Sequence, residues 1–214
     1  MDLPAHPPLP ADNPAWRLVV FVKAPRTGKV KTRLAATIGD QAACNAYRVL
    51  ALASLRQLQA FTNGELRFSP DEARGEIEPW RPAGWLARPQ GDGDLGGRLA
   101  RAFDEHFASG AARVVIVGTD CPYLTPADIH SAWLALETHD LVLGPARDGG
   151  YWLIGLKQSH TLLLRDISWS TADVLNQTLQ QAAKLNLRAQ LLRELEDVDD
   201  ESGWRAFLER ANQA

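Results

Sequence analysis

The sequence predicts an α/β fold built on a mostly parallel sheet. Short runs rich in Val, Ile and Leu alternate with longer stretches of helical period, which is the pattern of parallel strands joined by crossover helices. The run at 113–118 is apolar through its middle, as a central strand covered on both faces should be. At 214 residues the chain is long enough for one well-packed domain. We therefore expect a tail at 1–15 and a single domain at 16–214.

The first half of the domain is expected to alternate strands with helices. An apolar run at 18–22 predicts the first strand, and a helix is expected to open near Thr32. A second helix should cover about 40–60, and strands should follow at 65–68 and 85–88. The second helix has apolar residues at three- and four-residue spacing: Ala43, Ala46, Leu50 and Ala53.

The second half continues this alternation around the central strand at 113–118. Thr125 followed by Pro126 is a helix start, with threonine as the N-cap and proline in the first helical position, so a helix to about 138 is expected. A strand at 140–143 comes next, and a glycine turn at 148–150 leads into another strand.

The last part of the chain is expected to hold a helix, a short strand and a final helix. Thr171 is placed to cap the first of these helices, and the strand should cover 188–192. The final helix should follow the acidic segment 197–200 and run to about 210. Its inner side is marked by apolar residues: Trp204, Phe207 and Leu208.

Composition and charge exclude several classes of protein. A net charge of -3 gives no general nucleic-acid-binding face. Cys44 and Cys121 are the only cysteines and form no CxxC pair, which favours a reducing cytoplasm. The first fourteen residues are rich in proline and lack the apolar core of a signal peptide, so we expect a disordered tail on a cytoplasmic protein. All apolar runs are shorter than the roughly 20 residues that a membrane helix needs, so no membrane insertion is expected.

The most informative motif is a basic loop at 23–33, directly behind the first predicted strand. Gly28 lets backbone amides approach a ligand, and the helix opening near Thr32 adds N-terminal donors. Open α/β sheets bind ligands at the carboxyl ends of their strands, so this loop is suited to bind phosphates. The alternative is a solvated basic turn, which suits Arg26 and Lys29 best. The loop carries five cations: Lys23, Arg26, Lys29, Lys31 and Arg33.

Two glycine-containing stretches were compared with the usual nucleotide-binding motifs. The basic loop is not a Walker motif, because Val30 follows Gly28-Lys29 where serine or threonine is required. The stretch 91–96 matches GxGxxG, but a lone match is weak, and a dinucleotide site there leaves the basic loop without a role. We favour a flexible loop that covers a bound nucleotide. Three residues of this loop are then expected at the substrate, with the first two bonding a base or ribose: Gln90, Asp94 and Gly96.

Acidic residues at two places predict a divalent metal site. Asp120 follows the central strand and Pro122 fixes it, so its carboxylate should point into the crevice at the strand's end. The i, i+2 spacing of Asp197 and Asp199 puts both on one side of an extended segment. Magnesium favours one or two carboxylates together with substrate phosphate oxygens. The alternative for Asp120 is a turn or cap, and for Asp199 the N-cap of the final helix is an equally good interpretation.

The turn that begins at Asp148 and a tryptophan supply the remaining candidates. Asp148 either forms the turn or orients or deprotonates an acceptor. Gly149, Gly150 and Tyr151 follow it and are placed with it among the substrate-binding candidates. Aromatic residues are more often core than ligand platform, but Trp169 is framed by two serines and is expected to line a substrate pocket.

Four ordered motifs together resemble a known family. They are Lys23-x-Pro25-x-x-Gly28-x-x-Lys31-Thr-Arg33-Leu34, Gly118-x-Asp120-Cys-Pro122, Gly144-Pro-x-x-Asp148-Gly-Gly-Tyr151 and Asp197-Val-Asp199. The chain resembles the glycosyltransferase-like "transferase 1, rSAM/selenodomain-associated" family, which is similar to phospholactate guanylyltransferase and molybdenum-cofactor guanylyltransferase. The resemblance covers nearly the whole chain after the tail.

The resemblance implies a nucleotide-diphospho-sugar transferase (GT-A) fold, a Rossmann-like three-layer sandwich, with dependence on Mg2+ or Mn2+ and a nucleotide substrate. Lys23, Lys31 and Arg33 would then contact the phosphates. Asp120 would be the metal aspartate, with Asp197 or Asp199 as the second acidic group. The final motif departs from the family pattern Asp-Val-Asp-Thr-x-x-Asp, because Asp200 stands for the threonine and Gly203 for the last aspartate.

These observations predict a transferase that uses a nucleotide and a small-molecule acceptor. In the leading hypothesis an acceptor phosphate or hydroxyl attacks the α-phosphorus of a nucleoside triphosphate, while Lys31, Arg33 and the metal stabilise the leaving pyrophosphate. The nearest alternative is a glycosyltransferase that uses a nucleoside-diphosphate sugar, with Asp148 as the base. A non-catalytic nucleotide-binding module and a dehydrogenase built on 91–96 are weaker alternatives. We expect a monomer or homodimer.

Overall fold

The structure is a computed structural model that describes residues 13–213. One seven-stranded sheet has the order β3-β2-β1-β4-β6-β5-β7, and neighbouring strands are parallel except at β6, which is antiparallel to β4 and β5. The predicted α/β fold with a mostly parallel, mixed sheet and a central fourth strand is therefore confirmed. The strands are β1 (Trp16–Lys23), β2 (Gly64–Ser69), β3 (Leu86–Pro89), β4 (Arg113–Val117), β5 (Leu141–Pro145), β6 (Tyr151–Leu156) and β7 (Ala189–Leu191).

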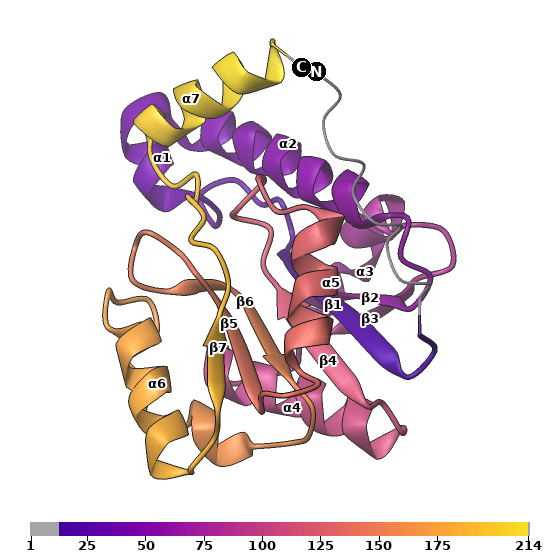
Figure 1. The fold of residues 1–214 in the computed structure, drawn as a ribbon. Helices are drawn as coiled ribbons and strands as arrows, with labels where there is room; N and C mark the ends of the chain where they lie inside the picture. Colours follow the sequence, from indigo (N-terminus) through magenta and orange to yellow (C-terminus); the bar gives the residue numbers. More distant parts are fainter. Residues whose placement is uncertain (1–12, 214) are drawn as a thin grey trace, which may run out of the picture.

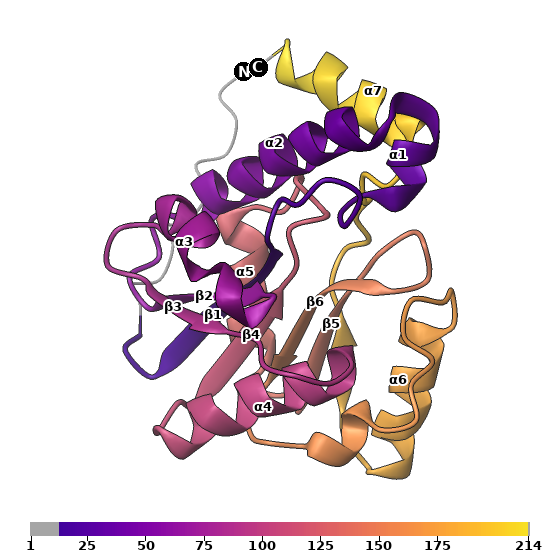
Figure 2. The same cartoon turned by 180° about the vertical axis from the view of Figure 1, so that it is seen from behind.

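Helices cover both faces of the sheet, with α5 in front in Figure 1 and α4 in front in Figure 2. No helix within residues 13–213 is long and apolar enough to span a membrane. The α-helices are α1 (Thr32–Ile38), α2 (Asp40–Leu58), α3 (Arg74–Ile77), α4 (Leu95–Ala108), α5 (Pro126–Ala135), α6 (Val174–Lys184) and α7 (Glu201–Ala211). Three short 3-10 helices complete the described elements: η1 (Asp71–Ala73), η2 (Glu78–Trp80) and η3 (Thr161–Leu164).

Alternating side chains of β1 separate two hydrophobic layers, because successive residues of a strand point to opposite faces. Leu18 and Val20 are fully buried in a cluster with residues of α2 and α5. Val19 is fully buried in a second cluster with residues of α4, η3 and α6. The sheet thus lies between two helical layers, which is the three-layer sandwich that the sequence predicted.

One edge of the sheet gathers the ends of three neighbouring strands. β1 ends at Lys23, β4 ends at Val117, and antiparallel β6 begins at Tyr151. The buried hydroxyl of Tyr47 on α2 accepts the Lys23 N–H at 2.7 Å and donates to the Lys23 carbonyl at 3.0 Å. The end of β1 is therefore fixed to the helix that packs on it.

Several local expectations differ from the structure. Thr171 does not cap α6, because the helix begins at Val174 and the Thr171 hydroxyl donates to the Ser168 carbonyl at 2.7 Å. Leu208 is 40% exposed, whereas Trp204 packs against a small cluster formed with α1 and α2. The connection between β2 and β3, for which no helix was expected, contains η1, α3 and η2. Residues 1–12 of the predicted tail lie outside the described residues.

Substitution of Gly64 tests how closely β2 packs against Trp85. A Cβ atom on Gly64 would lie 2.0 Å from the Trp85 indole, which is buried and donates its ring N–H to the Phe61 carbonyl at 2.6 Å. Because the indole cannot retreat, Gly64→Ala is expected to lower the free energy of unfolding by about 2 kcal/mol or more in a denaturant titration. Gly75→Ala on α3 is the matched control, since nothing lies within 4 Å of its Cβ. Equal effects of the two substitutions would contradict this packing.

Candidate active site

A cavity of about 440 Å³ opens at the carboxyl ends of β1 and β4. Its walls come from these strand ends, from the start of β6, from the first turn of α4 and from the loops around residues 169–171 and 197–199. Ten of the residues singled out from the sequence line it: Lys23, Lys31, Gln90, Asp120, Asp148, Gly150, Tyr151, Trp169, Asp197 and Asp199. Open α/β sheets bind ligands at this position.

Lys31 is the most tightly held charge of the cavity. Its side chain is 3% exposed, and its Nζ lies 2.5 Å from Asp120 Oδ1 and 2.8 Å from Asp199 Oδ1. Its backbone is left-handed (φ 48°), which turns the chain directly into α1. Burial lowers the pKa of Lys31, but the two carboxylates outweigh burial and raise that pKa above its usual value of 10.5. Lys31 is therefore a permanent cation at neutral pH.

The structure separates the two roles proposed for Asp199. The N-cap of α7 is Asp200, whose carboxylate accepts the Gly203 N–H at 2.9 Å. Asp199 instead faces the cavity and contacts Lys31 and Arg33, the latter at 3.5 Å. Burial alone would raise the pKa of Asp199, but these two cations hold it below its usual value. Asp200, which stands where the family motif has threonine, thus provides the N-cap of α7.

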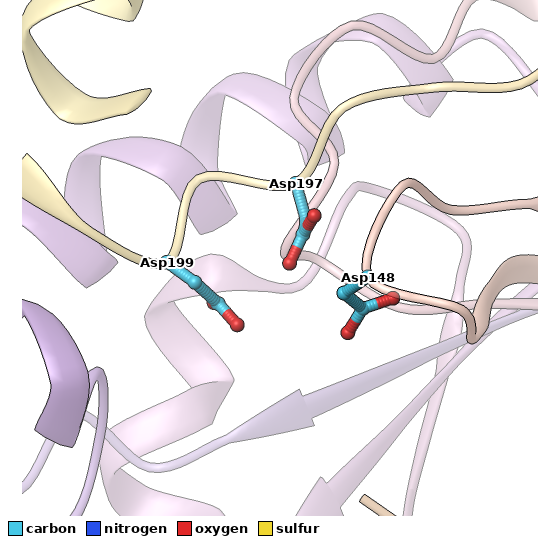
Figure 3. A group of neighbouring side chains, drawn as sticks. All are labelled: Asp148, Asp197 and Asp199. Atoms are coloured by element: carbon cyan, nitrogen blue, oxygen red, sulfur yellow. The ribbon is translucent and has the colours of Figure 1, made fainter. Parts of the chain in front are cut away.

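Three carboxylates converge on one point of the cavity (Figure 3). One oxygen from each of Asp148, Asp197 and Asp199 lies within 4.8 Å of the others. Asp197 is half-buried, and this burial together with the neighbouring charges of Asp199 and Asp148 raises the pKa of Asp197 to about 6. The protein therefore holds like charges together at an energetic cost.

This acidic group suits a divalent cation. Among residues 13–213, Asp120 and Asp199 form ion pairs with Lys31 or Arg33, whereas the two negative charges of Asp148 and Asp197 have no ion-pair partner. Carboxylate oxygens are also the ligands that Mg2+ and Mn2+ prefer. The predicted ligand Asp120 pairs with Lys31, and Asp148 lies beside Asp197 and Asp199. Which of these carboxylates holds a metal ion stays a prediction.

Lys23 is the cation of the cavity that is free to meet a ligand. Its side chain is exposed, and no carboxylate among residues 13–213 lies within ion-pair distance of its Nζ. The Tyr47 hydroxyl fixes its backbone, so the charge extends from a rigid strand end. The expected contact of Lys23 with a phosphate stays a prediction.

Three other predicted residues of the basic loop do not line the cavity. Arg26 pairs with Glu72 at 2.9 Å and with Glu76 at 2.7 Å, so its charge is satisfied within the fold. Arg33 is 67% exposed and reaches the site only through Asp199. Gly28 adopts a left-handed turn (φ 73°) and does not line the cavity. The structure thus brings Lys23 and Lys31 together but leaves these three residues at the periphery.

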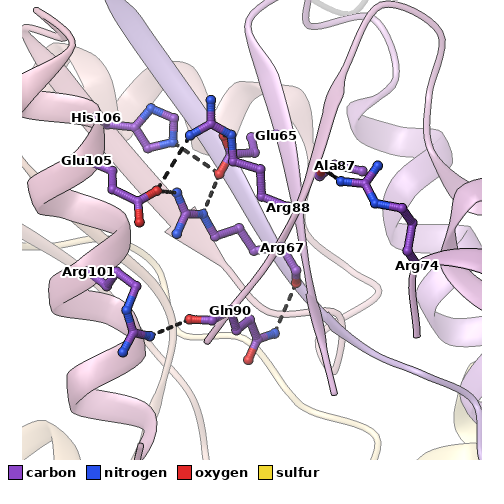
Figure 4. Close-up of polar contacts among 9 residues, drawn as sticks. All are labelled: Glu65, Arg67, Arg74, Ala87, Arg88, Gln90, Arg101, Glu105 and His106. Carbon is purple, nitrogen blue, oxygen red and sulfur yellow. Dashed lines mark hydrogen bonds and ion pairs between the residues drawn. The ribbon is translucent and has the colours of Figure 1, made fainter. Parts of the chain in front are cut away.

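The residues of the predicted nucleotide-covering loop have partners within the fold. Gln90 lines the cavity but is only 4% exposed, because its amide group donates to the Arg67 carbonyl at 3.0 Å (Figure 4) and to the Val22 carbonyl at 3.1 Å. Asp94 does not line the cavity, and it caps α4 by accepting the Gly97 N–H at 2.8 Å. A Cβ on Gly96 would lie 2.8 Å from the Trp169 indole nitrogen. Gly96 therefore permits close packing.

The turn that begins at Asp148 is built in a similar way. Asp148 is exposed, and its Oδ1 accepts the Gly150 N–H at 2.9 Å, which leaves Oδ2 free. Gly149 has φ 88°, and a Cβ there would lie 2.1 Å from the Ala172 carbonyl oxygen, so only glycine fits. Gly149 positions the turn, whereas Asp148 and Gly150 line the cavity.

Arg98 is a cavity residue that the sequence reasoning missed. It lies on α4, and its guanidinium donates to the Gly93 carbonyl at 2.9 Å and to the Ser69 hydroxyl at 3.2 Å. Its spacing gave a signal, because Leu95, Arg98 and Leu99 form one helical face and all three line the cavity. A single cation on an otherwise apolar helix face that follows a glycine loop is therefore a signal for a cavity-lining residue.

Comparison with known proteins places this fold in a family. Residues 51–171 match the family described as "Uncharacterized protein conserved in bacteria (DUF2064)". The chain belongs to the DUF2064 family. A protein from Desulfovibrio desulfuricans G20, named for a proposed role as a nucleotide-diphospho-sugar transferase, is 30% identical with a TM-score of 0.81. The match covers 87% of this chain and 83% of that one, and the expected nucleotide-diphospho-sugar transferase fold is thereby confirmed.

Two more distant structures share the fold of this DUF2064 protein. CMP:2-keto-3-deoxy-manno-octonic acid synthetase, solved with CTP, is 8% identical with a TM-score of 0.59, covering 92% of this chain and 98% of that one. A Mycobacterium tuberculosis H37Rv protein, solved with manganese, is 16% identical with a TM-score of 0.52, covering 91% and 98%. Among curated proteins, no relative of the chain was found.

The raised pKa of Asp197 predicts a stability effect in this DUF2064 protein. A carboxyl whose folded-state pKa lies above its unfolded value of 3.8 binds its proton more tightly in the fold, so its charge destabilises the protein above about pH 6. Asp197→Asn is expected to raise the metal-free unfolding free energy by about 1 kcal/mol near pH 7.5, after discounting for solvent screening. The gain should vanish as the pH falls from about 6 to about 4.

The matched control for this pH titration is Asp92→Asn. Asp92 is exposed on the loop before α4, and no cation among residues 13–213 lies within ion-pair distance of its carboxylate. Its substitution should leave stability nearly unchanged at every pH. A loss of stability in Asp197→Asn near pH 7.5 would contradict the repulsion between the three carboxylates.

Proposed function

We propose that this protein is a metal-dependent transferase that moves a nucleotidyl group from a nucleoside triphosphate to a small-molecule acceptor. The observation that carries the proposal is the charge pattern of the cavity. Two uncompensated negative charges suited to a divalent cation lie beside buried Lys31, while Lys23 is free to meet an anion. A triphosphate bound with a divalent cation complements this pattern.

The similar proteins support a nucleotide as the substrate. The Desulfovibrio desulfuricans protein is named for nucleotide-diphospho-sugar transfer, the synthetase of the same fold was solved with CTP, and the mycobacterial protein was solved with manganese. In this chain, Lys23, Lys31 and Arg98 are the cations that line the cavity, and they are the candidates for the phosphate contacts.

Asp197 and Asp199 are proposed to hold Mg2+ or Mn2+, with phosphate oxygens as further ligands. When bound there, the ion supplies electrostatic stabilisation of the phosphate oxygens. Asp120 is given a positioning role, because its contact with Lys31 Nζ directs that ammonium group toward the same end of the cavity. Lys31 and Lys23 then stabilise the charge that develops on the departing pyrophosphate.

The proposed reaction is one in-line displacement. The acceptor oxygen forms a bond to the α-phosphorus, the bond from that phosphorus to the oxygen bridging the β-phosphate breaks, and pyrophosphate leaves with the electron pair. A hydroxyl acceptor also loses a proton, which the free Oδ2 of Asp148 is placed to accept at the exposed side of the acidic group.

Glycosyl transfer from a nucleoside-diphosphate sugar is the second candidate function. The name of the 30% identical protein favours it, and the exposed Asp148 carboxylate suits the base of such a reaction. The acceptor oxygen would then attack the sugar carbon, and the nucleoside diphosphate would leave.

Product release with Mn2+ separates these functions. Ribonucleoside triphosphates are expected to give pyrophosphate in the presence of a bacterial metabolite extract, because the cavity binds a triphosphate with a cation. Release of nucleoside diphosphate from nucleotide sugars instead would establish glycosyl transfer. A nucleotide-binding module would bind nucleotide with Mn2+ in a thermal-shift assay and release neither product. Asp197→Asn should abolish the turnover.

Metal titration tests which aspartates hold the ion. Asp197→Asn is expected to weaken Mn2+ binding roughly 10- to 100-fold, measured as free Mn2+ by electron paramagnetic resonance, because it removes the least compensated carboxylate. Asp120→Asn should cost less than about threefold, because Lys31 already neutralises that charge. A greater loss in Asp120→Asn would make Asp120 the ligand, as first predicted from the sequence.

A further inference from the structure

We infer that the acceptor of this transferase is an uncharged ring-bearing alcohol and not a phosphate monoester, an inference that rests on the proposed function. The inference follows from the part of the cavity wall that faces Asp148. This part, here called the acceptor wall, consists of cavity-lining residues from α4, β6, the loop before α6 and the first position of α6: Leu95, Leu99, Tyr151, Trp169, Ser170 and Val174.

The acceptor wall is aromatic and aliphatic. Trp169 and Tyr151 are half-buried and meet edge to face, with ring centroids 6.4 Å apart and an interplanar angle of 84°. Leu95 is 42% exposed although it lines the cavity, whereas Leu99 and Val174 are buried. An indole face beside exposed apolar carbon binds the apolar face of a ring through dispersion and burial.

The charges around the acceptor wall exclude a dianionic ligand. The cavity-lining cations within residues 13–213 are Lys23, Lys31 and Arg98. Arg98 shares α4 with two residues of this wall, but its guanidinium is held by the Gly93 carbonyl and by the Ser69 hydroxyl at the end of β2. The turn at 148–150, which packs on the loop before α6, brings the carboxylate of Asp148. A phosphate monoester placed there would face carboxylates without a countercharge, because the metal, Lys23 and Lys31 are engaged by the triphosphate.

The acceptor wall is rigidly fixed to the reacting group. The Leu175 N–H donates to the Gly149 carbonyl at 2.9 Å, and the Ala172 carbonyl packs directly on Gly149. The Ser168 N–H donates to the Gln177 side chain at 2.7 Å, which anchors the other end of the loop to α6. Trp169 and Asp148 therefore line the cavity from segments that are packed on each other, and we infer that a ring bound on the indole directs a hydroxyl toward that carboxylate.

Binding of two matched probes tests the acceptor class. The protein is first saturated with Mn2+ and a non-hydrolysable nucleoside triphosphate, and phenyl β-D-glucoside or its 6-phosphate is then titrated by calorimetry. The neutral glucoside should bind at least about tenfold more tightly than the phosphorylated one, because only the latter brings negative charge to the acceptor wall. Equal or tighter binding of the phosphorylated probe, or no binding of either probe, would overturn the inference.

Two variants link this binding to the acceptor wall. Trp169→Ala should weaken the glucoside about tenfold and leave the nucleotide affinity unchanged, Trp169→Phe should retain most of the affinity, and Trp204→Phe on α7 is the control. Leu95→Lys should bring the two probes to similar affinity by supplying the missing cation. An unchanged glucoside affinity in Trp169→Ala, or an unchanged ratio of the two probe affinities in Leu95→Lys, would also overturn the inference. If the nucleotide and Mn2+ fail to bind at the first step, the proposed function itself fails, which distinguishes the two results.

Discussion

The contact of one buried ammonium group with two carboxylates organises the site. Lys31 Nζ joins α1 to the end of β4 through Asp120 and to the segment before α7 through Asp199. The Val198 N–H, which donates to the Asp120 carbonyl at 3.0 Å, adds a backbone link between the same two segments. Three parts of the chain that are far apart in sequence are thereby held at one sheet edge. Since Asp197 lies between these contacts, its position beside Asp148 also depends on them.

A second charged cluster shows why the first one points to a ligand. Glu65 and Arg67 are almost fully buried between β2 and α4, and Arg67 contacts both Glu65 and Glu105 (Figure 4). Arg88 lies 3.6 Å from both glutamates, and His106 Nε2 lies 3.5 Å from Glu65, so each of the two carboxylates has ion-pair partners within the cluster. Such a balanced network needs no outside partner and has a structural role. The aspartate group of the cavity lacks this balance, which is the physical reason for assigning it to a divalent cation.

The fold could be predicted from periodicity, and much of the site from its position behind strands. The buried run of β4 and the cations after β1 predicted both the central strand and a ligand-binding edge. Side-chain partners could not be predicted in this way, because Arg26 is neutralised by Glu72 and Glu76, which lie some fifty residues further along the chain. The position of Asp148 beside Asp197 and Asp199 likewise depends on how the strand-end loops are packed. Asp94 and Gly96 carried a motif, but their real constraints are a helix cap and a close contact with Trp169.

The most direct test of the central interaction is a double-mutant cycle of Lys31→Met and Asp199→Asn, followed by the free energy of unfolding in denaturant without metal. Removing Lys31 alone leaves the partly buried carboxylate of Asp199 without its nearest cation, and removing Asp199 alone leaves buried Lys31 with Asp120 as its remaining partner. The double variant carries neither charge of this pair. We expect a coupling energy of at least about 2 kcal/mol, with the double variant more stable than the sum of the single effects predicts. Single effects that add within about 0.5 kcal/mol would show that Lys31 does not hold these segments together.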